Sequence, residues 1–227
     1  MSFDQRSYSG KIFRPKPECQ YKDNERLLVV ATPWGNRSGT RRAVDTVTEF
    51  FLANSGDSEA TSPFRKLPQL SGVGNNLRIG VLLANEYLFN TENKDEFKNG
   101  AEFFAAAYDQ KELVWLQIGH PHVLLKREGR ALMQLSGNID LSMELSPNDD
   151  TPLPPLPGDL IGIDANPHIL INSFRPSPGD KLILISRSWL PQNLFMLSED
   201  QMNIDEIAMV LSRTDEDLPY WLGIWDL

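Results

Sequence analysis

The chain has 227 residues, 41% apolar and 23% charged, which fits one globular domain over residues 1–227 with a full core. Its net charge of -9 argues against nucleic acid and anionic membrane surfaces as partners, because their phosphates would repel it. The single cysteine excludes an internal disulfide, and without a bilayer-spanning apolar run or an apolar signal segment at the start we expect a cytoplasmic protein.

The N-terminal part of the chain predicts a strand followed by a helix. Residues 1–26 are polar, and we expect one edge strand there. Leu27 to Ala31 is an unbroken apolar run typical of a buried strand, although a buried helix can show the same run. Pro33 should end the strand, because proline cannot donate to a ladder. After Gly39 the spacing predicts a helix whose buried face consists of Ala43, Val44, Val47, Phe50 and Phe51.

The middle of the chain predicts a second helix and then strands. Residues 53–74 are small and polar and should form an exposed loop before a largely apolar helix over 75–90. Residues 137–158 carry five prolines and predict a loop or a reduced flap. Between these segments the pattern predicts an antiparallel meander of strands over 103–108, 112–118, 122–126 and 131–135.

The C-terminal part predicts further strands around a third helix. That helix contains Ile204 to Leu211, with Ser198 as its N-cap. The strands are expected over residues 160–163, 169–174, 181–186 and 218–225. Together the elements predict an α+β fold, two packed antiparallel β-sheets flanked by helices on both sides.

Local motifs give little support for a specific chemistry. The turn over residues 35–40 lacks the lysine of a phosphate loop, so a helix N-cap explains it better. His120 and His122 could share one side of a strand, but no third metal ligand is close in sequence, which favours a structural pair. Asp215 to Asp217 could bind a hard cation, although a solvated loop is the commoner explanation. Trp34 and Trp189 lie in predicted turns and are candidate anchors for a partner.

Five segments resemble the metal-dependent serine/threonine protein phosphatases of type 2C across nearly the whole chain. Gly10 to Cys19 resembles the family's opening segment, with one residue inserted. Leu28 to Gly39, Leu113 to Leu125 and Pro178 to Leu190 each resemble a hydrophobic strand with its adjoining turn, and Asp217 to Trp221 stands where the family has Asp-Asn before its closing strand. The resemblance implies an α-β-β-α sandwich, with a helix layer outside each of two antiparallel sheets. It also implies a site for two divalent metal ions held by aspartates.

The polar signature residues of the family are mostly replaced in this chain. Cys19, Thr32 with Pro33, and Arg187 stand where the resemblance places metal-binding residues, and only Asp217 matches a metal position. The resemblance therefore implies too few hard oxygen ligands for a metal pair. Arg14 matches the family's phosphate-contacting arginine, and a plain surface arginine remains the other interpretation.

We therefore hypothesise a catalytically inactive phosphatase-like protein without a cofactor, kept as a cytoplasmic module that binds a protein partner. The alternative is an active phosphatase with an altered Mn or Mg site built from Asp217 with Asp140 or Asp164. A structural subunit of a larger assembly is a third possibility. The residues expected at the binding surface are Arg14, Trp34, Arg37, His120, His122, Arg187 and Trp189.

Overall fold

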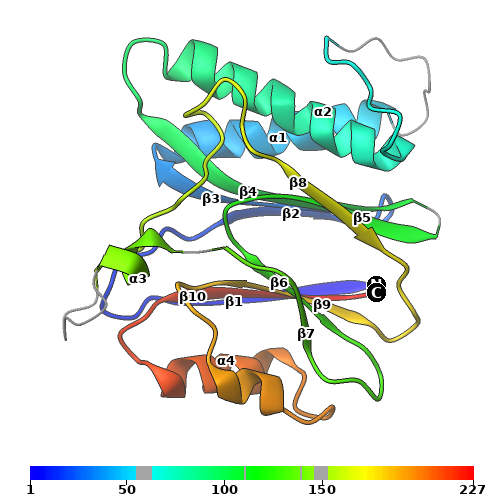
Figure 1. The fold of residues 1–227 in the computed structure, drawn as a ribbon, viewed down its shortest axis with the longest axis vertical. Helices are drawn as coiled ribbons and strands as arrows, with labels where there is room; N and C mark the ends of the chain where they lie inside the picture. The colour runs from blue at the N-terminus through cyan, green and yellow to red at the C-terminus, as the bar shows by residue number, and fades with distance from the viewer. Residues whose placement is uncertain (55–62, 110, 139, 146–152) are drawn as a thin grey trace. The chain divides into compact units, whose positions relative to one another are not determined.

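The structure is a computed structural model that describes residues 1–54, 63–109, 111–138, 140–145 and 153–227. It contains two antiparallel five-stranded sheets, and helices cover a face of each sheet (Figure 1). The chain divides into two compact units with one sheet each. Unit 1 comprises Met1–Lys16, His120–Gly158 and Ser177–Leu227, and unit 2 comprises Pro17–Gly119 and Asp159–Pro176. The predicted α+β class, two antiparallel sheets flanked by helices, is confirmed.

Unit 2 combines a sheet with two long helices. Its strands, in spatial order, are β2 (Glu18–Lys22), β3 (Leu27–Gly35), β4 (Asn99–Asp109), β5 (Glu112–Ile118) and β8 (Leu170–Phe174). The helices are α1 (Arg37–Asn54) and α2 (Gly72–Tyr87), and α2 continues into the π-helical turn η1 (Leu88–Glu92). Alternate residues of β3 and β4 pack with the apolar faces of both helices into one core. Both predicted helices and the buried strand are therefore present.

The strand β3 continues past the proline that was expected to end it. Thr32 pairs with Glu102 of β4, and the pairing goes on to Gly35. On the other side of β3, the neighbour β2 stops pairing at Ala31. From Thr32 onward that side of β3 is an edge, where the missing N–H of Pro33 costs no ladder hydrogen bond.

Unit 1 contains the other sheet and a shorter helix. Its strands, in spatial order, are β1 (Ser2–Tyr8), β10 (Tyr220–Asp226), β9 (Lys181–Ser186), β6 (His122–Lys126) and β7 (Met133–Ser136). The helix α4 (Ile204–Thr214) packs its apolar side against β9 and β10, and the 3-10 turn η2 (Gln192–Met196) contributes to the same core. The short helix α3 (Leu141–Leu145) lies between β7 and β8 in sequence.

Several predicted boundaries and pairings are wrong. The N-terminal region holds two strands, β1 and β2, and the expected meander is split, because β4 and β5 pair in unit 2 whereas β6 pairs with β7 and β9 in unit 1. Gly119, at a φ of +70°, turns the chain between them. Of the expected strand over 160–163, only a bridge from Ile161 to Ala101 forms. Asn203 rather than Ser198 caps α4, accepting from the amides of Asp205 and Glu206.

Two predicted loops fall partly outside the described residues. These are residues 55–62 of the loop over 53–74, and residues 139 and 146–152 of the flap over 137–158. In the part of the chain that the structure describes, no helix has both the length and the apolar character needed to cross a membrane.

Candidate functional site

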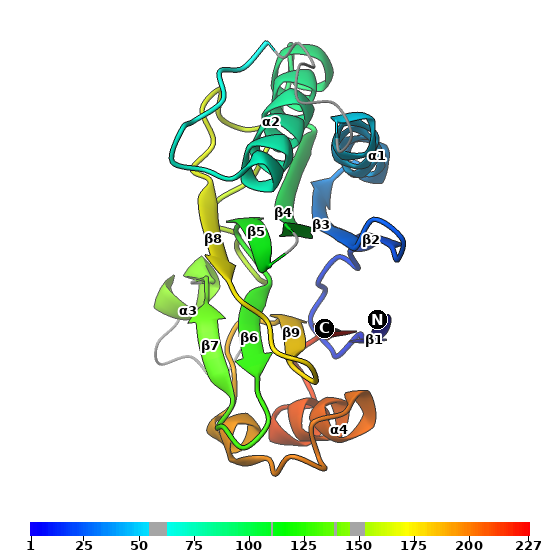
Figure 2. The same cartoon turned by 90° about the vertical axis from the view of Figure 1, so that its right-hand side faces the viewer.

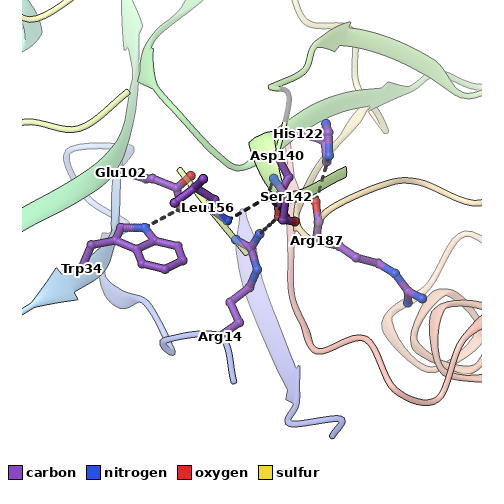
Figure 3. Close-up of polar contacts among 8 residues, drawn as sticks. All are labelled: Arg14, Trp34, Glu102, His122, Asp140, Ser142, Leu156 and Arg187. Atoms are coloured by element: carbon purple, nitrogen blue, oxygen red, sulfur yellow. Dashed lines mark hydrogen bonds and ion pairs between the residues drawn. The ribbon is translucent and has the colours of Figure 1, made fainter. Parts of the chain in front are cut away.

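In unit 2, the end of β3 places Trp34 against a buried carboxylate. Trp34 is half-buried, and its Nε1 donates a hydrogen bond to Oε2 of Glu102 at 3.1 Å (Figure 3). Glu102 is 0% exposed and lies opposite Thr32 in the β3–β4 ladder. Burying a carboxylate costs free energy unless it is hydrogen-bonded, so Trp34 helps to stabilise Glu102 there. Sequence reasoning missed Glu102, although it is the one charged residue in the apolar run from Gly100 to Ala107.

A second carboxylate of unit 2 binds the first turn of α1. Nε of Arg37 forms an ion pair with Oε1 of Glu18, and Arg41 approaches the same oxygen at 3.5 Å. The Arg37 side chain is half exposed, whereas that of Glu18 is mostly covered. Cys19, the next residue of β2, is half-buried and pairs with Val30. The predicted residue Arg37 is therefore accessible, and its carboxylate partner was not foreseen.

In unit 1, Arg14 and Asp140 form a buried ion pair. Arg14 Nη2 lies 3.3 Å from Asp140 Oδ2, and the two side chains are 3% and 1% exposed (Figure 3). Oδ1 of Asp140 accepts hydrogen bonds from the backbone amides of Ser142 and Leu156 and from the Ser142 hydroxyl. Burial would raise the pKa of Asp140, but the hydrogen bonds from Ser188, Leu156 and Ser142 outweigh it, and the pKa lies below its usual value. Arg14 is not a surface arginine.

The two histidines lie together at the start of β6. The ring centroids of His120 and His122 are 4.9 Å apart in an edge-to-face arrangement, and the residues are 2% and 6% exposed. His122 Nε2 is 3.1 Å from the backbone oxygen of Arg187, so that nitrogen donates to the carbonyl (Figure 3). This contact joins the start of β6 to the residue that follows β9 in the same sheet.

Arg187 directs its guanidinium toward the C-terminal end of α4. Nη1 donates to the backbone oxygen of Leu211 at 2.5 Å, and Nη2 donates to that of Asp215 at 3.2 Å. The side chain is 0% exposed, and the guanidinium lies 5.3 Å from the ring centroid of the half-buried Trp189. Burial lowers the pKa of Arg187, and the charge of Asp215 opposes that effect. The residue thus caps a helix end, where a cation interacts favourably with the helix dipole.

Asp217 lies on the segment before β10 and is engaged by Lys11. Its Oδ1 is 2.7 Å from Lys11 Nζ, and its backbone oxygen accepts from the amides of Lys11 and Ile12. The hydrogen bond and the charge of Asp217 raise the pKa of the exposed Lys11. Asp164, a carboxylate considered for the alternative metal site, is exposed in unit 2 and accepts from the amide of Asn166.

The side chains at the positions where the resemblance implies metal ligands do not have the chemistry of a site for two divalent ions. Such a pair needs several carboxylates and other hard oxygens that converge. Unit 2 offers a half-buried thiol at Cys19 and a neutral hydroxyl at Thr32, whereas unit 1 offers the cation Arg187 and an already paired Asp217. Among the described residues, neither unit holds a group of three or more His, Cys, Asp or Glu side chains arranged to bind a metal.

Comparison with known proteins gives matches at the level of structure. No protein-family model and no curated protein matches the sequence. The PPM Ser-Thr phosphatase MsPP from Mycobacterium smegmatis, solved with cacodylate, has a TM-score of 0.67 at 17% identity, covering 100% of this chain and 98% of its own. The serine/threonine phosphatase PstP/Ppp from Mycobacterium tuberculosis has a TM-score of 0.65 at 17% identity, with the same coverage.

A third similar structure contains metal. The catalytic domain of the serine threonine protein phosphatase PstP, in complex with 2 manganese ions, has a TM-score of 0.53 at 17% identity, covering 98% of this chain and 96% of its own. Identities this low establish likeness of fold and leave activity open. The resemblance seen in the sequence is confirmed at that level: this chain has the fold of the PPM/PP2C-type serine/threonine phosphatases.

Proposed function

We propose that this protein is a pseudophosphatase, a phosphatase-fold protein without metal-dependent catalysis, and that it acts as a cytoplasmic protein-binding or regulatory module. The observation that carries the proposal is Arg187. It stands where the resemblance places a metal-binding aspartate, and its guanidinium is fixed by two backbone carbonyls at the end of α4. Arg187 therefore supplies no oxygen ligand to a metal ion. Thr32 of β3, which the resemblance also places at a metal-binding position, supplies no negative charge.

A manganese titration of the metal-stripped protein tests this proposal. We expect no saturable heat up to millimolar manganese, and no release of phosphate from phosphopeptides in its presence. Asp217→Ala serves as the matched control, because it should leave both results unchanged. Saturable binding in the micromolar range that is lost in Asp217→Ala would overturn the proposal.

An active phosphatase with an altered Mn or Mg site is the second candidate. It is favoured by Asp140, a carboxylate that the fold keeps buried in unit 1, the unit that also contains Asp217. This candidate predicts manganese-dependent phosphate release that Asp217→Ala abolishes. Turnover that is absent with every divalent metal would exclude it.

We assign partner binding to those predicted binding residues that solvent can reach. Trp34 and Trp189 are half-buried and the Arg37 side chain is 50% exposed. Of the other four predicted residues, His120, His122 and Arg187 are buried, and the side chain of Arg14 is 3% exposed. Tryptophan and arginine are the side chains that most often anchor protein interfaces. The side chains of these four residues lie inside unit 1 and support its structure.

Alanine substitutions at Trp34, Arg37 and Trp189 test this assignment. Immobilised full-length protein should lose captured proteins in one or more of these variants, because truncating an anchor typically costs more than ~1 kcal/mol of binding. Lys22→Ala, at an exposed position of β2, is the control and should capture normally. If all three variants capture the same proteins as the parent, the partner binds elsewhere.

A further inference from the structure

The strand β1 forms an exposed edge of the sheet in unit 1. It pairs on one side with β10, from Ser2 opposite Asp226 to Tyr8 opposite Tyr220, and it is the first strand in the order of that sheet (Figure 2). No other strand pairs with it among the described residues. Six of its seven residues are exposed. An edge of this kind presents backbone N–H and C=O groups that another strand can pair with.

Side chains on both faces hold this edge in its extended conformation. On the face toward α4, Arg6 forms an ion pair with Asp205 at 2.5 Å, and the ring of Tyr8 stacks on that of Tyr220. On the opposite face, Trp221 Nε1 donates to Gln5 Oε1 at 3.0 Å. The strand is therefore ordered before any partner arrives, which reduces the entropy that a partner would have to overcome.

The charges of β1 are complementary to a second copy of the same strand. Antiparallel pairing about a two-fold axis through Gln5 places Asp4 of each copy opposite Arg6 of the other. Both residues project from the same face of the strand, so the opposite charges become direct cross-strand neighbours twice.

The neighbouring registers are disfavoured by the same charges. A shift of the pairing in one direction centres it on Asp4 and sets two carboxylates against each other, and a shift in the other direction centres it on Arg6 and opposes two guanidinium groups. In the registers between these, backbone N–H and C=O groups that point away from β10 would lie opposite groups that point toward their own sheet, so the ladder hydrogen bonds would not form. The sequence of β1 thus selects a single self-complementary register.

We propose that β1 is a dimerisation strand, through which two copies of this chain join their five-stranded sheets into one continuous sheet. The contact uses the same residues on both subunits, so it closes at two copies instead of growing into a fibre. Both α4 helices lie on the same face of the joined sheet. The contact uses none of the residues Trp34, Arg37 and Trp189, and the inference does not depend on the absence of catalysis.

Charges on an edge strand often serve the opposite purpose, which is to prevent pairing with other strands. The two interpretations differ in the expected effect of reversing one charge. If Asp4 and Arg6 serve to prevent pairing at this edge, the protein is monomeric and neither charge reversal changes its oligomeric state. If they select the dimer register, each reversal alone weakens self-association, and the two reversed chains recognise each other.

Charge reversal combined with sedimentation velocity of the full chain distinguishes them. We expect the parent to dimerise with rising concentration, and Asp4→Arg or Arg6→Asp alone to weaken the dimer by about tenfold, because each sets like charges opposite at two places. An equimolar mixture of the two variants should form a heterodimer, since the two arginines of one variant then meet the two aspartates of the other.

Arg175→Asp is the matched control, because Arg175 is an exposed arginine in an exposed ion pair with Glu112, far from β1 in the sequence. It should dimerise as the parent does. The double variant Asp4→Arg with Arg6→Asp restores complementarity and should dimerise by itself. A parent that stays monomeric at all concentrations, single reversals that leave the dimer intact, or a mixture that does not associate would each overturn the proposal.

Discussion

The ion pair of Arg14 and Asp140 shows how charge is kept inside unit 1. Removing two charges from water is costly, and their attraction compensates only when other hydrogen bonds satisfy the remaining atoms. Asp140 meets this condition, because one carboxylate oxygen receives the Ser142 and Leu156 amides while the other faces Arg14. The pair and its hydrogen bonds therefore link Arg14, which precedes β2, to Asp140, Ser142 and Leu156, all within unit 1.

We expect Asp140→Asn to destabilise the protein by about 3 kcal/mol at neutral pH, because it leaves the guanidinium of Arg14 buried without a counter-charge. The pKa of Asp140 is lowered in the folded protein, so its contribution is complete above the ordinary pKa of aspartate, about 4, and is lost as the pH falls through the folded value. The stability gap between parent and variant should therefore close in acid.

Denaturant unfolding of both proteins from pH 7 down to pH 3 measures that gap. Arg14→Met and the double variant complete a thermodynamic cycle, in which the second substitution should cost much less than the first. A gap that stays constant over the whole pH range would show that Asp140 does not act through its charge.

For single residues of the site, the sequence indicates the residue type but not its contacts in the fold. The isolated charge of Glu102 indicates a buried carboxylate that needs a donor, but nothing local identifies Trp34, which lies 68 positions away. The resemblance to the phosphatases places Arg187 at an aspartate position. Sequence alone does not show where a long, flexible side chain points, and the guanidinium binds the carbonyls of Leu211 and Asp215 at the end of a later helix.

At the scale of elements, periodicity identified most helices and strands but not their partners. The apolar patterns of β5 and β6 predict strands, and both strands are present, but the two strands belong to different sheets. An apolar pattern indicates that a strand is buried and does not indicate which strand it pairs with. The continuation of β3 through Pro33 has a similar cause. Proline is tolerated there because β2 stops pairing at Ala31, a fact about a neighbouring strand.

Helix α4 illustrates competition between two plausible start signals. Ser198 followed by Glu199 and Asp200 has the composition of a helix N-terminus, but the Ser198 hydroxyl bonds Asp200 and Gln201 in the preceding turn. Asn203 accepts two backbone amides and begins the helix. At the other end Arg187 binds the carbonyls of Leu211 and Asp215, so side chains bind backbone groups at both ends of α4.

For the whole molecule, the path of the chain predicts that the two units stabilise each other through connectivity. Unit 1 is interrupted by one excursion from Pro17 to Gly119 and a second from Asp159 to Pro176. The first excursion begins just before β2 and ends just after β5, two strands of the same sheet. Three strand-to-strand spacings separate β2 from β5, a distance of about 14 Å. If unit 2 unfolds, closing that loop of about a hundred residues costs unit 1 up to ~4 kcal/mol.

A substitution confined to the core of unit 2 should therefore lower the stability of unit 1 as well. Leu77→Ala removes a fully buried side chain of α2 and should destabilise unit 2 by about 3 kcal/mol. Hydrogen exchange should then accelerate for the core amides of β9, such as those of Ile183 and Leu184, as well as for β3. Glu49→Ala, at an exposed position of α1, should change neither. Faster exchange in β3 with unchanged exchange in β9 would mean that the units open independently, and that the interleaved chain path does not couple their stabilities.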